Sequence, residues 1–177
     1  MDEKTVSSKK VYESSFLTMY EDQVLLENGM KSQRVYVKHI GAAAVLPITK
    51  DGKIILTKQF RYPVKKVTIE IPAGKKDEID ERGIDCIKRE LEEETGYQSN
   101  DIRHVYDIHN CLGYSDELIE MFIAYDCFEV ENPLESDPDE FIEIELYEID
   151  VLKEMIKKNE ITDVKTILMI QNYILNG

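Results

Sequence analysis

The sequence has no long apolar run and is short of positive charge. No stretch approaches the roughly 18 consecutive apolar residues that cross a bilayer, and the start, Met1-Asp2-Glu3-Lys4, lacks the apolar segment of a secretory signal. We therefore expect a cytoplasmic protein with no membrane partner. Lysine and arginine number 22 against 36 acidic residues, a formal net charge of −14. This balance disfavours nonspecific binding to nucleic acid or to an anionic membrane.

Cysteine is scarce as well. Cys86, Cys111 and Cys127 form an odd, scattered set without paired spacing. A disulfide framework and a cysteine-based zinc site are therefore not expected. Cys86 lies in a segment that reads as helix and Cys127 in an apolar strand-like run, so we expect both to be buried small apolar groups.

The remaining sequence predicts a globular α+β protein. Its 177 residues, 42% of them hydrophobic, suffice for one domain with a sizeable core. Many short strands, one acidic helix and two closing helices indicate an α+β or α/β/α arrangement. The predicted strands are 35–37 leading into 41–48, then 53–60, 67–71, 102–109, 118–128 and 141–146, and the predicted closing helices are 150–158 and 162–175.

The N-terminal part carries turn signals of its own. Residues 16–20 and 24–26 flank Glu21-Asp22-Gln23 as hairpin strands flank a turn, and Asn28-Gly29 is a second, stronger turn signal. Residues 1–11 are polar, and we expect them to be mobile or packed on a partner. We interpret residues 1–40 as an N-terminal extension and residues 41–177 as the main domain.

The acidic helix is the most informative segment. Residues three and four apart share a helix face, so Glu90, Glu93 and Glu94 lie close enough to repel one another. A hard divalent cation among the carboxylates removes this repulsion. Ile84, Ile87 and Leu91 give the helix an apolar face to bury. The alternative interpretation is a solvated acidic helix without a ligand.

The order of residues around this helix distinguishes the two interpretations. Gly74, Glu81 and the run from Arg89 to Tyr97 resemble the Nudix box, G-x5-E-x7-R-E-U-x-E-E-x-G-U, where U is a bulky apolar or aromatic residue. Six residues instead of five separate Gly74 from Glu81, which we interpret as one extra loop residue. The resemblance implies the Nudix fold, an α/β/α sandwich around a mixed β-sheet, here with an N-terminal β-hairpin extension. It also implies structural roles for Gly74, Glu81 and Gly96, and an ion pair of Arg89 with Glu81.

The resemblance further implies a metal site. Glu90 and Glu94 are expected to bind Mg²⁺ directly, Glu93 directly or through water, and the carbonyl of Ala73 is another expected ligand. Mn²⁺ is a possible substitute. Such a cluster suits pyrophosphate chemistry, because bound cations neutralise the substrate charge and activate water.

Segments outside the box resemble the ADP-ribose pyrophosphatase branch of the family. They include Gln59-Phe60-Arg61, the run Glu70 to Gly74, and Gly113-Tyr114-Ser115-Asp116-Glu117. Arg61 is the candidate phosphate clamp, since guanidinium binds phosphate oxygens bidentately. Glu70 and Gly113 are further candidate substrate contacts. For each of these three residues a purely structural role is the alternative.

The expected general base lies downstream of the box. Glu140 precedes Phe141-Ile142-Glu143-Ile144 as the base precedes a similar strand in this branch, and a carboxylate there could accept a proton from the attacking water. Asp137, Asp139 and a glutamate of the box such as Glu93 are the rival candidates. Aromatic stacking on the adenine could involve any of four side chains: Phe16, Tyr20, Tyr36 and Tyr62.

The resemblance thus predicts a metal-dependent enzyme that cleaves ADP-ribose to AMP and ribose 5-phosphate. A nucleotide-sugar hydrolase acting on GDP-mannose or ADP-glucose is the nearest alternative. A module that senses ADP-ribose without cleaving it is a third, although all three metal glutamates are present. The resemblance also implies a homodimer formed through the N-terminal extension, and no nucleic-acid partner.

Overall fold

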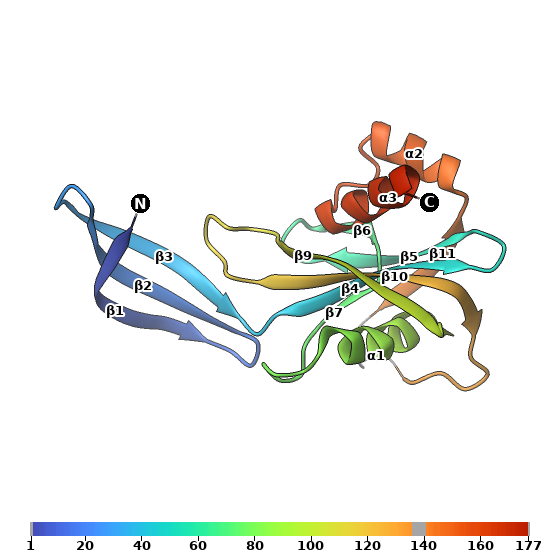
Figure 1. Cartoon of the computed structure of the whole chain (residues 1–177), viewed down its shortest axis with the longest axis horizontal. Helices are drawn as coiled ribbons and strands as arrows, with labels where there is room; N and C mark the ends of the chain where they lie inside the picture. Colours follow the sequence, from blue (N-terminus) through green and yellow to red (C-terminus); the bar gives the residue numbers. More distant parts are fainter. Residues whose placement is uncertain (1, 136–140, 177) are drawn as a thin grey trace.

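The computed structural model describes residues 2–135 and 141–176, which form two β-sheets and three helices (Figure 1). A three-stranded sheet, β1-β2-β3, extends to one side of an eight-stranded sheet. The strands are β1 (Glu3–Glu13), β2 (Leu17–Leu26), β3 (Lys31–His39), β4 (Ala42–Thr49), β5 (Ile54–Arg61), β6 (Lys66–Glu70), β7 (Ala73–Lys75), β8 (Tyr97–Gln98), β9 (Asp101–His109), β10 (Leu118–Glu129) and β11 (Ile142–Tyr147), and the helices are α1 (Gly83–Thr95), α2 (Ile149–Lys157) and α3 (Val164–Asn176).

Strand β4 runs through the middle of the larger sheet and is buried on both faces. It pairs parallel with β10 and antiparallel with β5 and β7, so the sheet is mixed. Successive side chains of a strand point to opposite faces. Accordingly Ala44 and Leu46 join one hydrophobic cluster, while Ala43 and Val45 join the other.

The helices cover these two faces (Figure 1). Helix α1 packs on one side through Cys86, Ile87 and Leu91, as its apolar spacing predicts. Helices α2 and α3 pack on the other side, where Leu152 and Met169 are fully buried. The expected α/β/α sandwich with a mixed sheet is therefore confirmed. No helix within residues 2–135 and 141–176 is long and apolar enough to cross a membrane.

The N-terminal sheet differs in detail from the expectation. The predicted turn at 21–23 is wrong, because β2 runs unbroken from Leu17 to Leu26. Asp22 is only 6% exposed there, and its carboxylate accepts a hydrogen bond from Tyr36 at 3.2 Å. The first turn instead lies before β2. Residues 3–11, expected to be mobile or packed on a partner, belong to β1. The second turn is where Asn28-Gly29 predicted it, with Gly29 at φ +80°.

The two sheets are joined by hydrogen bonds to the loop that follows β9. The amide of Val37 in β3 donates to the carbonyl of Tyr114 at 2.7 Å, and the amide of Asp116 donates back to Val37 at 3.2 Å. The side chain of Asp116 also accepts from the amide of His39 at 2.9 Å. These bonds fix the end of the small sheet against the loop that connects β9 to β10.

Candidate active site

Helix α1 presents its acidic face to strand β7. Glu90 and Glu94 are each only 9% exposed, which is unusual for charged side chains unless they are paired. The amide of Ala73 in β7 donates a hydrogen bond to Glu94 Oε2 at 3.1 Å. The structure therefore brings the candidate ligands Ala73, Glu90 and Glu94 together at one junction of helix and strand.

Gly74 is required by this packing. A Cβ atom at position 74 would lie 1.9 Å from the carboxyl carbon and from Oε1 of Glu90. Any larger residue would push the Glu90 carboxylate from its place against the backbone of β7. At the other end of the helix, Gly96 adopts the left-handed conformation with φ 72°, and its amide donates to the carbonyl of Glu92.

Arg89 lies among the carboxylates. Its Nη1 contacts Glu90 Oε1 at 2.8 Å and Glu93 Oε2 at 3.1 Å. The expected partner Glu81 is farther away, with 3.8 Å between Nη2 and Oε1. Burial lowers the pKa of Arg89, but the charge and hydrogen bond of Glu90 outweigh burial and raise it. The guanidinium thus offsets part of the repulsion between Glu90 and Glu93.

Glu81 has a second contact that fixes the loop. Its Oε2 accepts a hydrogen bond from the backbone amide of Asp77 at 2.7 Å. Asp77 in turn lies 3.6 Å from Nε of Arg89. Glu81 therefore connects the loop with its extra residue to helix α1, both through this amide and through the longer contact with Arg89.

The carboxylate cluster suits a hard divalent cation. Its atoms are carboxylate and carbonyl oxygens, the ligands that Mg²⁺ prefers. Among the described residues, no group of three or more His, Cys, Asp or Glu side chains is placed to hold a metal ion by itself. Mg²⁺ does not need one, because it usually takes one or two carboxylates and fills its other positions with water and substrate phosphates. The chemistry of the donors and the glycine packed beneath Glu90 therefore fit such an ion.

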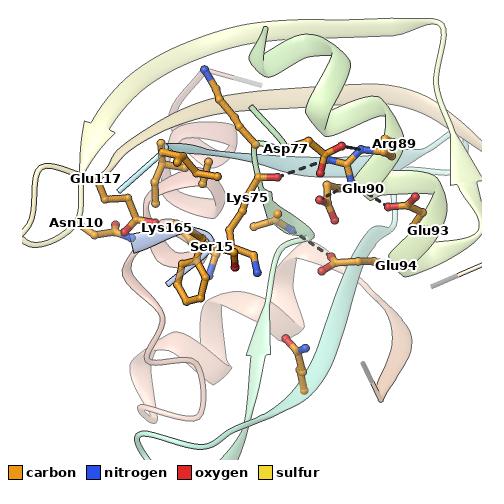
Figure 2. Close-up of a pocket in the computed structure, with 18 of the residues that line it drawn as sticks. Ser15, Lys75, Asp77, Arg89, Glu90, Glu93, Glu94, Asn110, Glu117 and Lys165 are labelled. Carbon is orange, nitrogen blue, oxygen red and sulfur yellow. Dashed lines mark hydrogen bonds and ion pairs between the residues drawn. The ribbon is translucent and has the colours of Figure 1, made fainter. Parts of the chain in front are cut away.

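A cavity of about 570 Å³ opens beside this cluster, and Figure 2 shows its wall. Glu90, Glu93, Glu94 and Arg89 line one part of it. Four further cations line other parts: Arg61, Lys75, Lys76 and Lys165. The cavity therefore combines metal-type oxygen ligands with positive side chains, despite the acidic charge of the whole chain. This combination is suited to a diphosphate.

Glu70 organises two of these cations. Nε and Nη2 of Arg61 donate to its two oxygens at 2.8 and 2.9 Å, and Thr68 Oγ1 donates to Oε1 at 2.6 Å. Nζ of Lys165, from the start of α3, donates to Oε2 and also lies 3.0 Å from Asp163. Burial raises the pKa of Glu70, but Arg61, Lys165 and Thr68 outweigh it and hold the pKa at about 2.

The remaining predicted site residues do not all line the cavity, and some lie outside the described residues. Gly113 does not line the cavity, and an added Cβ there would meet nothing within 4 Å. Its role in substrate binding therefore stays a prediction. Glu140, like Asp137 and Asp139, lies outside the described residues. Of the four candidate stacking aromatics, Phe16 lines the cavity, and the charged end of Lys75 lies 4.6 Å from the centre of its ring.

Sequence reasoning missed several residues of this wall. Lys165 is 7% exposed and reaches the cavity from α3, which the spacing around the box could not indicate. Ser15, Asn110 and Glu117 line it from turns and strand ends. A lysine directly after Asp163-Val164 was the one signal in the sequence, since a lysine in the first turn of a helix opposes the helix dipole and favours a nearby acid.

The layered fold and the cavity together define a class of proteins that handle phosphate groups. Carboxylates on one helix and cations from several other elements meet at the same cavity. The chain belongs to the NUDIX family, because the model of the NUDIX domain matches residues 37–168.

Individual relatives cover nearly the whole chain. The ADP-ribose pyrophosphatase of Bacillus subtilis (strain 168) is 36% identical, across 97% of this chain and 92% of its own length. The methanol dehydrogenase activator of Bacillus methanolicus is 34% identical, across 96% and 91%. The GDP-mannose pyrophosphatase of Escherichia coli (strain K12) is 35% identical, across 80% and 76%. A solved structure described as an ADP compounds hydrolase superposes with a TM-score of 0.82 at 19% identity, across 100% and 96%, and supports the fold.

Proposed function

We propose that this chain is a metal-dependent Nudix hydrolase that cleaves ADP-ribose to AMP and ribose 5-phosphate. One observation carries the proposal: the same cavity is lined by the carboxylates of Glu90, Glu93 and Glu94 and by the cations Arg61 and Lys165. The similarity to a named ADP-ribose pyrophosphatase along nearly the whole chain favours this substrate.

Four groups would hold the cation: the carboxylates of Glu90, Glu93 and Glu94 and the carbonyl of Ala73. Mg²⁺ is the proposed ion, with Mn²⁺ as a substitute, since both accept oxygen ligands. When bound, the ion supplies charge neutralisation at the diphosphate and lowers the pKa of water. Arg89 balances Glu90 and Glu93 and so keeps these side chains at the cavity.

The other residues bind the substrate and move a proton. Arg61 donates to the diphosphate through nitrogen not already bonded to Glu70, because Nε and Nη2 both donate to that carboxylate. Phe16 provides an aromatic face for the adenine. Glu140 accepts the proton of the attacking water, and Gly113 lets the backbone approach the substrate. Glu70 holds Arg61 in place through both carboxylate oxygens, and its direct contact with the substrate stays a prediction.

We also propose that residues 1–40 form a dimerising extension of the domain at 41–177. The separate three-stranded sheet supports this, because it exposes Val11, Tyr12, Met30 and Val35, each more than 40%. Exposed apolar groups on a small sheet favour association. Light scattering of the purified chain should give twice the mass of 20.6 kDa. A monomeric mass would contradict the proposal.

The alternatives differ in substrate or in catalysis. A nucleotide-sugar hydrolase would use the same metal site, and the similarity to a GDP-mannose pyrophosphatase is the reason to keep it. A sensor that binds without cleaving is disfavoured, because all three metal glutamates are present. A nucleic-acid substrate is disfavoured by the net charge of −14.

Product analysis separates these possibilities. The purified protein is incubated with Mg²⁺ and, in separate reactions, ADP-ribose, ADP-glucose, GDP-mannose, NADH and diadenosine polyphosphates. We expect AMP and ribose 5-phosphate from ADP-ribose at the highest kcat/KM. A higher kcat/KM for a nucleotide sugar would refute the substrate, and no turnover of any compound would favour the sensor.

A further inference from the structure

One positive side chain of the cavity differs from the others in its partners. Four of the cations that line the cavity form ion pairs: Arg61 with Glu70, Lys76 with Glu120, Arg89 with Glu90 and Glu93, and Lys165 with Glu70 and Asp163. Lys75 also lines the cavity, but within residues 2–135 and 141–176 it contacts no carboxylate. Its charge is therefore not neutralised by the protein and is available to an anionic ligand.

An aromatic ring takes the place of a carboxylate beside Lys75. The ammonium lies over the ring of Phe16, 4.6 Å from its centre, which is within the range of a cation–π interaction. Such a contact limits where the flexible side chain points and leaves its charge unchanged. Figure 2 shows Ser15 and Lys75 on one side of the cavity, and Glu93 and Glu94 on the other.

The ring itself is held by the small sheet of the same chain. Phe16 lies in the turn between β1 and β2, and its carbonyl accepts a hydrogen bond from the amide of Ile40 at 3.3 Å. The edge of the aromatic pair is formed with His39, at 5.7 Å between ring centres. Ser15, Phe16 and Ile40 all line the cavity. The N-terminal sheet thus builds the part of the wall that holds Lys75.

Lys75 also belongs to the strand that supports the carboxylate cluster. It is the last residue of β7 and pairs with Ala42, which lines the cavity as well. The residue before it, Gly74, packs against the carboxylate of Glu90. The carbonyl of Ala73, a proposed ligand of the cation, lies on the same three-residue strand. The backbone of β7 therefore attaches the unpaired ammonium to the proposed metal side of the cavity.

We propose that Lys75 binds a phosphate oxygen of the substrate diphosphate, and that Phe16 positions its ammonium for this contact. Lysine binds phosphate as a point charge, and a charge that has no protein partner loses no ion pair when the ligand arrives. A side chain already confined by the ring also loses less conformational freedom on binding. The inference rests on the proposed function, since the diphosphate belongs to its substrate.

The test measures binding without turnover. The ligand is α,β-methylene ADP-ribose, in which a carbon atom replaces the oxygen between the two phosphorus atoms, so that it is not hydrolysed. Its affinity is measured by calorimetry with Mg²⁺ for the unmodified protein, Lys75→Met, Lys75→Arg, Phe16→Leu and the double variant Lys75→Met with Phe16→Leu. Lys88→Met is the control, because it removes the same charge from an exposed position of α1 that does not line this cavity. Melting temperatures confirm that each variant is folded.

The charge of Lys75 accounts for the first expected result. Lys75→Met should weaken binding roughly tenfold, as loss of one hydrogen bond to a charged group does, whereas Lys75→Arg should retain most of the affinity. Lys88→Met should change the affinity less than twofold. The proposal is overturned if Lys75→Met binds within twofold of the unmodified protein, or if Lys88→Met weakens binding as much as Lys75→Met does.

The double variant tests the role of Phe16. Phe16→Leu should weaken binding roughly 2- to 5-fold, the value of an exposed cation–π contact. Its effect should be smaller once Lys75 is methionine, because the ring then has no cation to hold. An equal effect of Phe16→Leu in both backgrounds overturns the positioning role, since a ring that contacts only the adenine acts independently of Lys75.

These outcomes are independent of catalysis. If the unmodified protein with Mg²⁺ does not hydrolyse ADP-ribose, the proposed function fails, whatever the calorimetry gives. If it hydrolyses ADP-ribose and Lys75→Met binds the analogue as the unmodified protein does, only the role of Lys75 fails.

Discussion

Replacement of Glu70 by glutamine should substantially lower the free energy of unfolding of the protein. Glu70 is 5% exposed and accepts hydrogen bonds from Arg61, Thr68 and Lys165. Glutamine has nearly the same shape but no charge, and its NH₂ group would face a donor. Arg61 and Lys165 would then be left without their shared counter-charge. Loss of one partner of a buried ion pair is strongly destabilising.

The pKa of Glu70 gives the magnitude. Its usual pKa is 4.5, and in the folded protein it is about 2. Each unit corresponds to about 1.4 kcal/mol, so the ionised carboxylate stabilises the fold by about 3 kcal/mol at neutral pH. The measured cost of breaking buried ion pairs is similar, at roughly 3–5 kcal/mol. For a chain of this length, 3 kcal/mol lowers the melting temperature by roughly 6–12 °C.

The same contribution depends on pH in a defined direction. Between pH 4.5 and about 2, the unfolded chain binds a proton at position 70 that the folded protein does not bind. Stability therefore falls as pH falls through this window, and the contribution is fully present above about pH 5.5. In Glu70→Gln the corresponding proton is absent, so the difference in stability between the two proteins should shrink as pH is lowered.

Urea denaturation at several pH values measures this difference. Glu145→Gln is a matched control, because Glu145 pairs with Lys58 at the exposed surface and should change stability little. The reasoning is refuted if Glu70→Gln unfolds within 1 kcal/mol of the unmodified protein at pH 7. It is also refuted if the difference is the same at pH 3.5 as at pH 6.

Three further substitutions test the active site. Gly74→Ala should lower kcat/KM more than about tenfold with little loss of stability, because the added Cβ displaces only the flexible end of Glu90; unchanged kcat/KM would contradict the packing argument. Glu94→Gln should lower kcat by orders of magnitude while circular dichroism shows a folded protein, and near-normal turnover with Mg²⁺ would exclude Glu94 as a ligand. Glu140→Gln should lower kcat more than it changes KM, and a rise in KM alone would argue against a general base.

The layers of the fold could be predicted because their signals are local. The continuous apolar run of β4 and the spacing of Ile87 and Leu91 in α1 depend on near neighbours, and both faces of the sheet follow from them. The turn at 21–23 was mispredicted for the opposite reason. Polar residues usually mark turns, but Asp22 is kept in a strand by Tyr36 on the neighbouring strand, a contact that local pattern does not encode.

The residues of the site also fall into two groups, those that local spacing predicts and those that only tertiary packing brings together. Spacing alone places Glu90, Glu93 and Glu94 on one face, because a helix fixes the relation of residues three and four apart. The contact of Lys165 with Glu70 joins residues 95 positions apart and depends on how α3 packs on the sheet. No periodicity predicts such a contact. For that reason the part of the wall built from α3 and from the β9–β10 end was found only in the structure.

The extra loop residue shows why the box tolerates a change of spacing. Gly74 remains beneath Glu90, so the carboxylate side of the cavity is set by β7 and α1. The added length lies in residues 77–80, which are all exposed, with Ile79 79% exposed to solvent.

Glu81 still reaches the amide of Asp77 and lies 3.8 Å from Arg89 at the far side of this segment. A loop held at both ends can bulge into solvent, because closing a slightly longer loop costs little entropy. The constraint on the box is therefore the position of its two anchors, and the number of residues between them is secondary.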